Sequence, residues 1–177
     1  MSEPSTYGSI SAIEPDWSRE TKPFWAWAPS KSLLASIRAH QRHRGSRNPL
    51  RIALRKLATL RHIFWSIVTA ADVPVNCQLG GGFAMPHPSG IVVHPSARIG
   101  PNCMLLQQVT IGDRNGVPTL GGHVDVGAGA KVLGAIHIGD HARIGANAVV
   151  LQDVPQGATA IGVPARIVSG EPPSKLL

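Results

Sequence analysis

The stretch that decides the fold is VHPSARIGPNCMLLQQVTIGDRNGVPTLGGHVDVGAGAKVLGAIHIGDHARIGANAVV, residues 93–150, in which a long or branched aliphatic residue returns at almost every sixth position. A second apolar, often small residue stands two positions before most of these aliphatics. The series is Val93, Ile99, Leu105, Ile111, Leu120, Val126, Val132, Ile138, Ile144 and Val150. A period of six fits neither an α-helix nor a single alternating strand, so the stretch indicates a hexapeptide repeat.

Hexapeptide repeats fold by stacking, because one unit cannot bury its apolar face alone. Each hexad forms a short strand and a corner, and three hexads close a triangular coil of about 18 residues. Coils stacked at roughly 4.8 Å share parallel sheets, and the aliphatic side chains fill the prism. The six-residue spacing also holds upstream through Val73, Leu79, Met85 and Ile91, so the repeat is expected to begin close to Asp72. The sequence therefore predicts a mainly β protein built as a parallel β-helix.

Two breaks interrupt the six-residue count. The spacing lengthens to eight residues over 91–99 and to nine over 111–120. The longer break contains the polar turn sequence DRNGVP at 113–118, and loops that leave a rigid scaffold often carry function. After Val150 the pattern fades, and a closing strand or loop is expected, followed by a disordered tail at 171–177.

Charge divides the chain into unequal parts. Residues 21–71 hold ten Lys or Arg and no acidic residue, whereas residues 72–177 hold six of each sign. The net charge of +7 therefore comes from the first of these segments. Residues 1–20 hold four acids and one Arg, which suggests a mobile or surface-draped arm. We expect an N-terminal arm and basic helical region at 1–71 and a β-helix domain with a closing loop and tail at 72–177.

Helix-start chemistry predicts helices over 30–42 and 49–70, after Pro29-Ser30 and Asn48-Pro49. The basic residues of the second helix exclude a transmembrane span. A basic amphipathic helix can lie on an anionic membrane or bind nucleic acid. The role favoured here is to cover the open first coil, whose strand edges would otherwise be exposed, and to contact other subunits.

Cys77 and Cys103 stand two positions before an aliphatic residue of the repeat, so they are expected to be buried thiols rather than a disulfide. The N-terminal sequence lacks the basic start and apolar run of a signal peptide. Together these features predict a cytoplasmic location.

A filled prism leaves no interior space for a ligand, so binding is expected in grooves outside it, most naturally between subunits. His87 lies in the sequence MPHPSG at 85–90, just before the first break. A neutral imidazole near pH 7 is a suitable general base toward a hydroxyl group. The alternative is an ordinary surface histidine.

Residues 72–168 resemble the catalytic domain of the serine acetyltransferase family, whose members fold as left-handed β-helices. The motifs that carry this resemblance are His87-Pro88-Ser89-Gly90-Ile91-Val92-Val93, Gln108-Val109-Thr110-Ile111-Gly112, Gly127-Ala128-Gly129-Ala130-Lys131-Val132-Leu133-Gly134 and Gly162-Val163-Pro164-Ala165-Arg166-Ile167-Val168. The resemblance implies an acyltransferase domain at 72–177 that makes O-acetylserine from L-serine and acetyl-CoA for cysteine biosynthesis. It also implies a trimer or a hexamer, because the family's larger helical region joins trimers into hexamers. A homotrimer is favoured here, since only about 70 residues with two predicted helices precede Asp72.

The resemblance implies roles for individual residues as well. His87 would be the general base, and Asp72, fifteen residues earlier, would fix its tautomer and stabilise the imidazolium. Fifteen residues are three fewer than one coil, so direct pairing requires an irregular first coil.

The resemblance makes acetyl-CoA the cosubstrate, with no metal. The family lays the pantetheine arm along the coils of the C-terminal half. This places CoA near Ala128 and Ala146, with Arg166 and Arg143 as candidate partners of its phosphates.

Two departures from the family pattern affect the acceptor. Pro86 stands where the family has Asp, and a shorter loop carries Gly116-Val117-Pro118 where the family has Arg-His-Pro. Asp113 and Arg114 in this loop are then the candidate acceptor contacts. Relatives with comparably shortened loops include acetyltransferases of exopolysaccharide pathways. A sugar or exopolysaccharide precursor is therefore the alternative acceptor, and the basic helices would suit peripheral membrane contact.

Two other classes compete with this interpretation. The γ-type carbonic anhydrases use the same scaffold and bind zinc through three His across a subunit interface. Here the two breaks misalign His87 and His123, and His137 and His141 are four residues apart instead of five. The other class is a non-catalytic hexapeptide scaffold with a basic surface-binding arm. No nucleic acid partner is expected.

Overall fold

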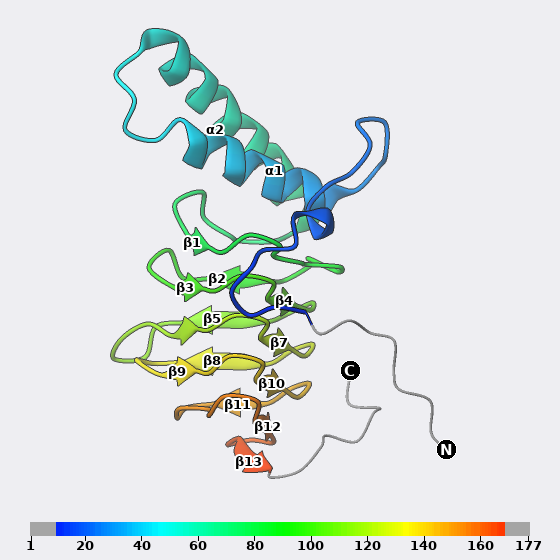
Figure 1. Cartoon of the computed structure of the whole chain (residues 1–177), viewed down its shortest axis with the longest axis vertical. Helices are drawn as coiled ribbons and strands as arrows, with labels where there is room; N and C mark the ends of the chain where they lie inside the picture. Colours follow the sequence, from blue (N-terminus) through cyan, green and yellow to red (C-terminus); the bar gives the residue numbers. More distant parts are fainter. Residues whose placement is uncertain (1–9, 169–177) are drawn as a thin grey trace.

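The computed structural model describes residues 10–168 and shows the expected left-handed parallel β-helix, with two helices across its N-terminal end (Figure 1). The helical elements are η1 (Trp17–Arg19), α1 (Pro29–Arg42) and α2 (Pro49–Thr69). The strands are β1 (Gln78–Leu79), β2 (Val92–Val93), β3 (Arg98–Ile99), β4 (Met104–Leu105), β5 (Thr110–Gly112), β6 (Thr119–Leu120), β7 (Asp125–Val126), β8 (Lys131–Leu133), β9 (His137–Ile138), β10 (Arg143–Ile144), β11 (Val149–Val150), β12 (Thr159–Ile161) and β13 (Arg166–Val168).

The strands form the three faces of the prism. Their orders are β1-β3-β6-β9, β13-β12-β10-β7-β4 and β11-β8-β5-β2, and every pair is parallel except β12 with β13. All ten aliphatic residues of the repeat point inward, and each is at most 3% exposed. The predicted hexapeptide core is confirmed.

The strand register shows how the prism absorbs the two breaks. Val92 of β2 pairs with Thr110 of β5, eighteen residues later, as three hexads require. Gln78 pairs with Arg98, twenty residues later, because this interval includes one step of eight residues. That step runs from Met85 to Val93 and not over 91–99 as expected, since Val93 and Ile99 are both buried strand residues six positions apart. Arg98 pairs with Thr119, twenty-one residues later, across the nine-residue spacing. Each break therefore enlarges one corner and leaves the interior column in register.

The β-helix continues beyond the point where the sequence pattern fades. Val154 bridges in parallel to Ile138, and Ala160 of β12 pairs with Ile144. Both side chains are buried. This coil is sixteen residues long, two fewer than three full hexads, and the shortening interrupts the six-residue spacing before Val154 and Ala160. The last strand, β13, turns back antiparallel on β12 and closes the sheet.

The corners between faces form three edges, which we name by what lies there. The His87 edge, between the β4 and β2 faces, comprises 85–91, 106–109, 127–130 and 145–148. The arm edge, between the β1 and β4 faces, comprises 80–83, 100–103, 121–124, 139–142 and 155–158. The loop edge, between the β2 and β1 faces, comprises 94–97, 113–118, 134–136 and 151–153.

The predicted helices are confirmed within one residue at either end. The two helices have different roles, which the sequence did not predict. Leu33, Leu34 and Ile37 of α1 join the core of the coils, so α1 covers the open first coil. Helix α2 packs on α1 through a narrow buried strip that includes Ala58 and His62, and most of its large apolar residues stay exposed.

The described part of the N-terminal arm, residues 10–20, lies along the arm edge. The side chain of Asn102 is fully buried there and donates to the carbonyl oxygens of Ser11 and Glu14, at 2.7 Å each. It also accepts from the amide of Asp16 at 2.7 Å. One side chain thus satisfies three backbone groups of the arm, which explains why this stretch is draped on the prism. The mobility expected for residues 1–9 and for the tail at 171–177 concerns residues outside the described range.

Both cysteines are free and buried, as expected. Burial raises the pKa of each thiol to about 12, so both stay protonated at neutral pH. Within residues 10–168, no helix combines the length and apolarity that crossing a membrane would require. The division of the chain at residue 72 stays a prediction, because α1 shares the core of the coils.

The inward column supplies a sharp stability test. Val93 is 1% exposed and points into the prism, whereas the neighbouring Val92 is 40% exposed and points outward. Val93→Ala is expected to lower the free energy of unfolding by about 2 kcal/mol, from lost burial plus a cavity. Val92→Ala, the matched control, should change it by less than about 0.5 kcal/mol. Urea unfolding measures both, and equal losses would contradict the inward assignment.

Candidate active site

His87 lies at the first corner of the His87 edge, with its side chain exposed to solvent. It lines a cavity of about 340 Å³ together with its neighbours Pro86, Pro88 and Ser89. The opposite wall comes from the helical region: Pro29 and Ser30 at the start of α1, and Val68 and Thr69 at the end of α2. The amide of Gly90 donates to the carbonyl of Ala70, which joins the His87 corner to the end of α2. The imidazole is therefore accessible from a cavity large enough for a small acceptor.

Asp72 begins the first coil, and its backbone bridges in parallel to Val92. Its side chain is exposed on the β2 face. Among residues 10–168, no hydrogen bond or ion pair joins the Asp72 carboxylate to the His87 imidazole. The first coil is irregular, as direct pairing requires, because it contains the eight-residue spacing. Even so, the Asp72 carboxylate and the His87 imidazole are not bonded to each other. The role of Asp72 stays a prediction.

The CoA candidates Ala128 and Ala146 stand on the same edge as His87. The carbonyl of Ala128 accepts from the amide of Asn147 at 2.8 Å, so these corners lie directly on each other. Backbone hydrogen bonds continue this stacking of corners toward the first coil. The amide of Gly129 donates to the carbonyl of Gln107, and the amide of Gln108 donates to the carbonyl of Ser89. Ala146 is exposed and Ala128 partly exposed. Their small side chains leave the edge open from His87 toward the C-terminal coils.

Arg143 and Arg166 flank this edge on the adjoining face. Arg143 is exposed on β10, in register with Asp125 of β7. Arg166 is exposed on β13, opposite Ile161. Neither guanidinium is within 4.0 Å of a carboxylate in the described part of the chain. The ion pair found there joins Arg38 and Glu20. Both are therefore free to meet an anionic group.

The structure does not bring Asp113 and Arg114 together with His87 in one chain. Both are exposed on the loop edge, where the loop rests on the next coil through Gly116 and Ala135. The β2 face separates this loop from the His87 edge. The loop can reach a His87 cavity only on another subunit.

The histidines considered for zinc also lie apart from His87. His123 and His141 are on the arm edge, in adjacent coils, with their Nδ1 atoms 2.8 Å apart. Burial lowers the pKa of His123, which favours a neutral imidazole in this pair. No group of three His, Cys, Asp or Glu side chains in the described residues is arranged to hold a metal ion.

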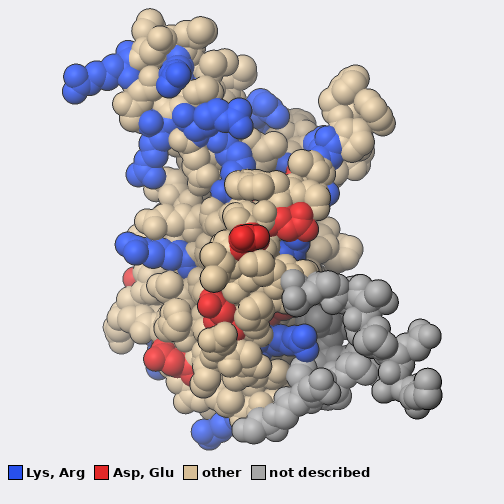
Figure 2. Space-filling view, viewed as in Figure 1, with Lys and Arg blue, Asp and Glu red and all other residues tan. Residues whose placement is uncertain are grey.

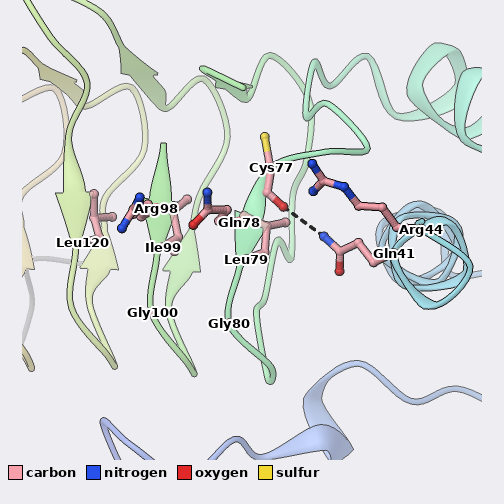
Figure 3. Close-up of a pocket in the computed structure, with 10 residues that line it drawn as sticks. All are labelled: Gln41, Arg44, Cys77, Gln78, Leu79, Gly80, Arg98, Ile99, Gly100 and Leu120. Atoms are coloured by element: carbon pink, nitrogen blue, oxygen red, sulfur yellow. Dashed lines mark hydrogen bonds between the residues drawn. The ribbon is translucent and has the colours of Figure 1, made fainter. Parts of the chain in front are cut away.

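A separate groove of about 470 Å³ lies between α1 and the β1-β3-β6 face (Figure 3). Gln41 of α1 donates there to the carbonyl of Cys77 at 2.9 Å, and Arg44 and Arg98 also line it. It contains none of the residues predicted for the site.

Sequence reasoning missed the wall that the helices give the His87 cavity. Ser30 and Val68 are ordinary helix residues in the sequence, and no motif marks them. The packing of α1 on the first coil places Ser30 beside His87, and the hydrogen bond from Gly90 to Ala70 holds the end of α2, with Val68, at the same corner.

The comparisons with known proteins agree with the geometry, although no family model matches the chain. A serine acetyltransferase of Helicobacter pylori strain J99 is 38% identical over 143 residues, which is 78% of this chain and 80% of that protein. The serine acetyltransferase of Synechococcus elongatus is 42% identical over 107 residues, 58% of this chain and 44% of that protein. A solved serine acetyltransferase in complex with CoA superposes with a TM-score of 0.65 at 35% identity.

The extent of these matches differs among relatives. The match to the Helicobacter protein covers most of both chains, whereas this chain covers 58% of the chain solved with CoA. The chain thus spans about half the length of the longer relatives and most of the shorter one.

Proposed function

Because the chain belongs to the serine acetyltransferase family, we propose that it transfers the acetyl group of acetyl-CoA to the hydroxyl of L-serine, yielding O-acetylserine and CoA for cysteine biosynthesis. The observation that carries this proposal is the continuous His87 edge. A candidate base stands in a cavity at one end, and the small corners of Ala128 and Ala146 continue along it. We also infer a cytoplasmic location, where the two buried thiols stay reduced.

The residues support a direct transfer. A ring nitrogen of His87 accepts the proton of the acceptor hydroxyl while that oxygen attacks the thioester carbonyl carbon. The tetrahedral oxyanion is stabilised by hydrogen-bond donors, its carbon–sulfur bond breaks, and the imidazolium returns the proton to the CoA thiolate. Asp72, in this proposal, favours the imidazolium through its charge.

The CoA contacts can be tested by binding alone. Arg143→Ala and Arg166→Ala are each expected to weaken CoA binding about tenfold, since a guanidinium–phosphate contact is charge-assisted. Arg98→Ala, an exposed Arg on a different face, is the matched control and should bind CoA normally. Calorimetry with CoA measures all three. Absence of CoA binding by the unaltered protein would favour a non-catalytic scaffold.

We further infer a homotrimer with its three sites between adjacent prisms. The separation of the loop edge from the His87 edge supports it, because a neighbouring subunit must bring Asp113 and Arg114 to His87. Light scattering is expected to give the mass of three chains. A stable monomer would contradict the shared site.

A sugar or exopolysaccharide precursor stays the second candidate acceptor. The cavity beside His87 favours it, because the residues that line it supply hydroxyl groups from Ser30 and Ser89 and no acidic or basic side chain other than His87. Such a wall suits a neutral, hydroxylated molecule. We also infer a peripheral membrane contact through the basic helices, supported by the surface of α2.

A further inference from the structure

Helix α2 presents an apolar face without a partner among residues 10–168. Leu57, Leu60, Phe64 and Ile67 recur at intervals of three and four residues, so they share one side of the helix. They are 54%, 64%, 55% and 77% exposed. The opposite side of α2 carries Ala58, His62 and Thr69, which are buried. The exposed face is therefore not the one that packs on α1.

An aromatic loop before α1 extends this face. Phe24 and Trp25 are 91% and 76% exposed, and their rings meet edge to face with centroids 5.0 Å apart. Trp27 packs on Trp65 of α2 with centroids 5.7 Å apart, which fixes the loop beside the C-terminal half of α2. In Figure 1 the loop projects from the body beyond the start of α1. Two separate segments thus expose large apolar side chains at the same end of the molecule.

The charge around this surface has one sign. Residues 21–71 contain ten Lys or Arg and no acid. On α2 itself, Lys56 and Arg61 flank the apolar face, whereas Arg51 and Arg55 lie on the side of Ala58 and His62. Figure 2 shows Lys and Arg side chains gathered over the helical end, with the acidic side chains over the coils. Among the described residues, one ion pair involves this segment: the Arg38 guanidinium lies 2.7 Å from the Glu20 carboxylate. The remaining cations therefore have no carboxylate partner in the described residues.

We propose that Phe24, Trp25, Leu57, Leu60, Phe64 and Ile67 form a docking surface for an anionic lipid bilayer. Leu and aromatic side chains on one face of a helix bury in the boundary between headgroups and acyl chains, and flanking Lys and Arg meet the lipid phosphates. Self-association through this surface would bring two acid-free segments of ten cations each together, which like-charge repulsion opposes. An anionic membrane complements both the charge and the apolar face.

The docking surface adjoins the cavity beside His87. Val68, one residue after Ile67, lines that cavity together with Pro29, five residues after Phe24. Docking therefore holds the cavity close to the lipid surface. Membrane binding itself does not depend on which acceptor is acetylated.

Sedimentation of the full chain with vesicles tests the proposal. Binding is expected to vesicles of phosphatidylcholine with phosphatidylglycerol, to fall steeply at high salt, and to be at least about tenfold weaker with phosphatidylcholine alone. Tryptophan emission should shift to the blue on binding. Leu60→Glu and Trp25→Glu should each weaken binding about tenfold or more. Leu151→Ser, an exposed apolar position on the loop edge, is the matched control and should bind as the unaltered chain does.

The outcomes separate the alternatives. Circular dichroism and light scattering first establish that each variant keeps its fold and its oligomeric state. Absence of binding to anionic vesicles, or equal binding by all variants, would overturn the proposal. A drop in oligomer mass caused by Leu60→Glu would also overturn it, because the face would then be covered by a second copy of the chain.

Discussion

Replacing His87 with alanine is expected to lower kcat by about 100-fold or more, the usual scale for losing a general base. The imidazole is exposed in its corner, so its loss leaves the buried core untouched and the variant should unfold at the same urea concentration as the unaltered chain. The measurement is CoA release from acetyl-CoA at saturating acceptor. Near-normal turnover by His87→Ala would show that the site lies elsewhere.

Asp72→Asn is the companion variant and is expected to lose less activity. Its carboxylate makes no described hydrogen bond to His87, so it can act only through its charge or after a rearrangement. A loss as large as that of His87→Ala would instead indicate direct pairing during the reaction. His137→Ala is a suitable control, because His137 is an exposed histidine on β9, on a face away from the His87 edge.

The second large effect concerns the affinity for L-serine. Pro86 lines the cavity beside His87 and offers no charge, and Val117 packs against the core where the family has a histidine. An unpaired ammonium or carboxylate in a cleft costs several kcal/mol, which corresponds to orders of magnitude in affinity. We therefore expect a KM for L-serine on the order of millimolar or higher, unless Asp113 or Arg114 of a neighbouring subunit supplies the contact.

A single substitution tests this reason directly. Pro86→Asp restores the carboxylate that the family carries before its catalytic His, and it is expected to lower the KM for L-serine by about tenfold. Pro155→Asp, at an exposed corner of the arm edge, is the matched control and should leave KM unchanged. A micromolar KM for the unaltered protein would contradict the expectation. Turnover with a sugar or glycan precursor alone would identify the alternative acceptor.

Much of the fold could be predicted because the prism interior imposes a strict period. In a hexapeptide prism the same position of each hexad points inward, so the aliphatic series from Val93 to Val150 was assigned from its spacing. The coil that contains Val154 was not predicted, because counting hexads does not reveal a corner that is two residues shorter. Burial of Asn102 was equally hidden, since its three bonds depend on where residues 11–16 lie.

The candidate site was predictable in part. His87 stands in a distinctive motif, and Ala128 and Ala146 were assigned through the family resemblance. The helical wall was not predictable, because both helices are amphipathic and the sequence does not say which one meets the coils. In the structure α1 does so through Leu33, Leu34 and Ile37, which leaves the broader apolar face of α2 outside.

The most direct test of the central claim combines CoA release with mass spectrometry of the product. The unaltered protein is incubated with acetyl-CoA and L-serine, and in parallel with sugars and glycan precursors. The account predicts release of CoA that requires a hydroxyl acceptor, an acetyl group on an oxygen of that acceptor, and loss of both signals in His87→Ala. Acceptor-independent release, or no release with any hydroxyl acceptor, would contradict acetyl transfer at the His87 edge.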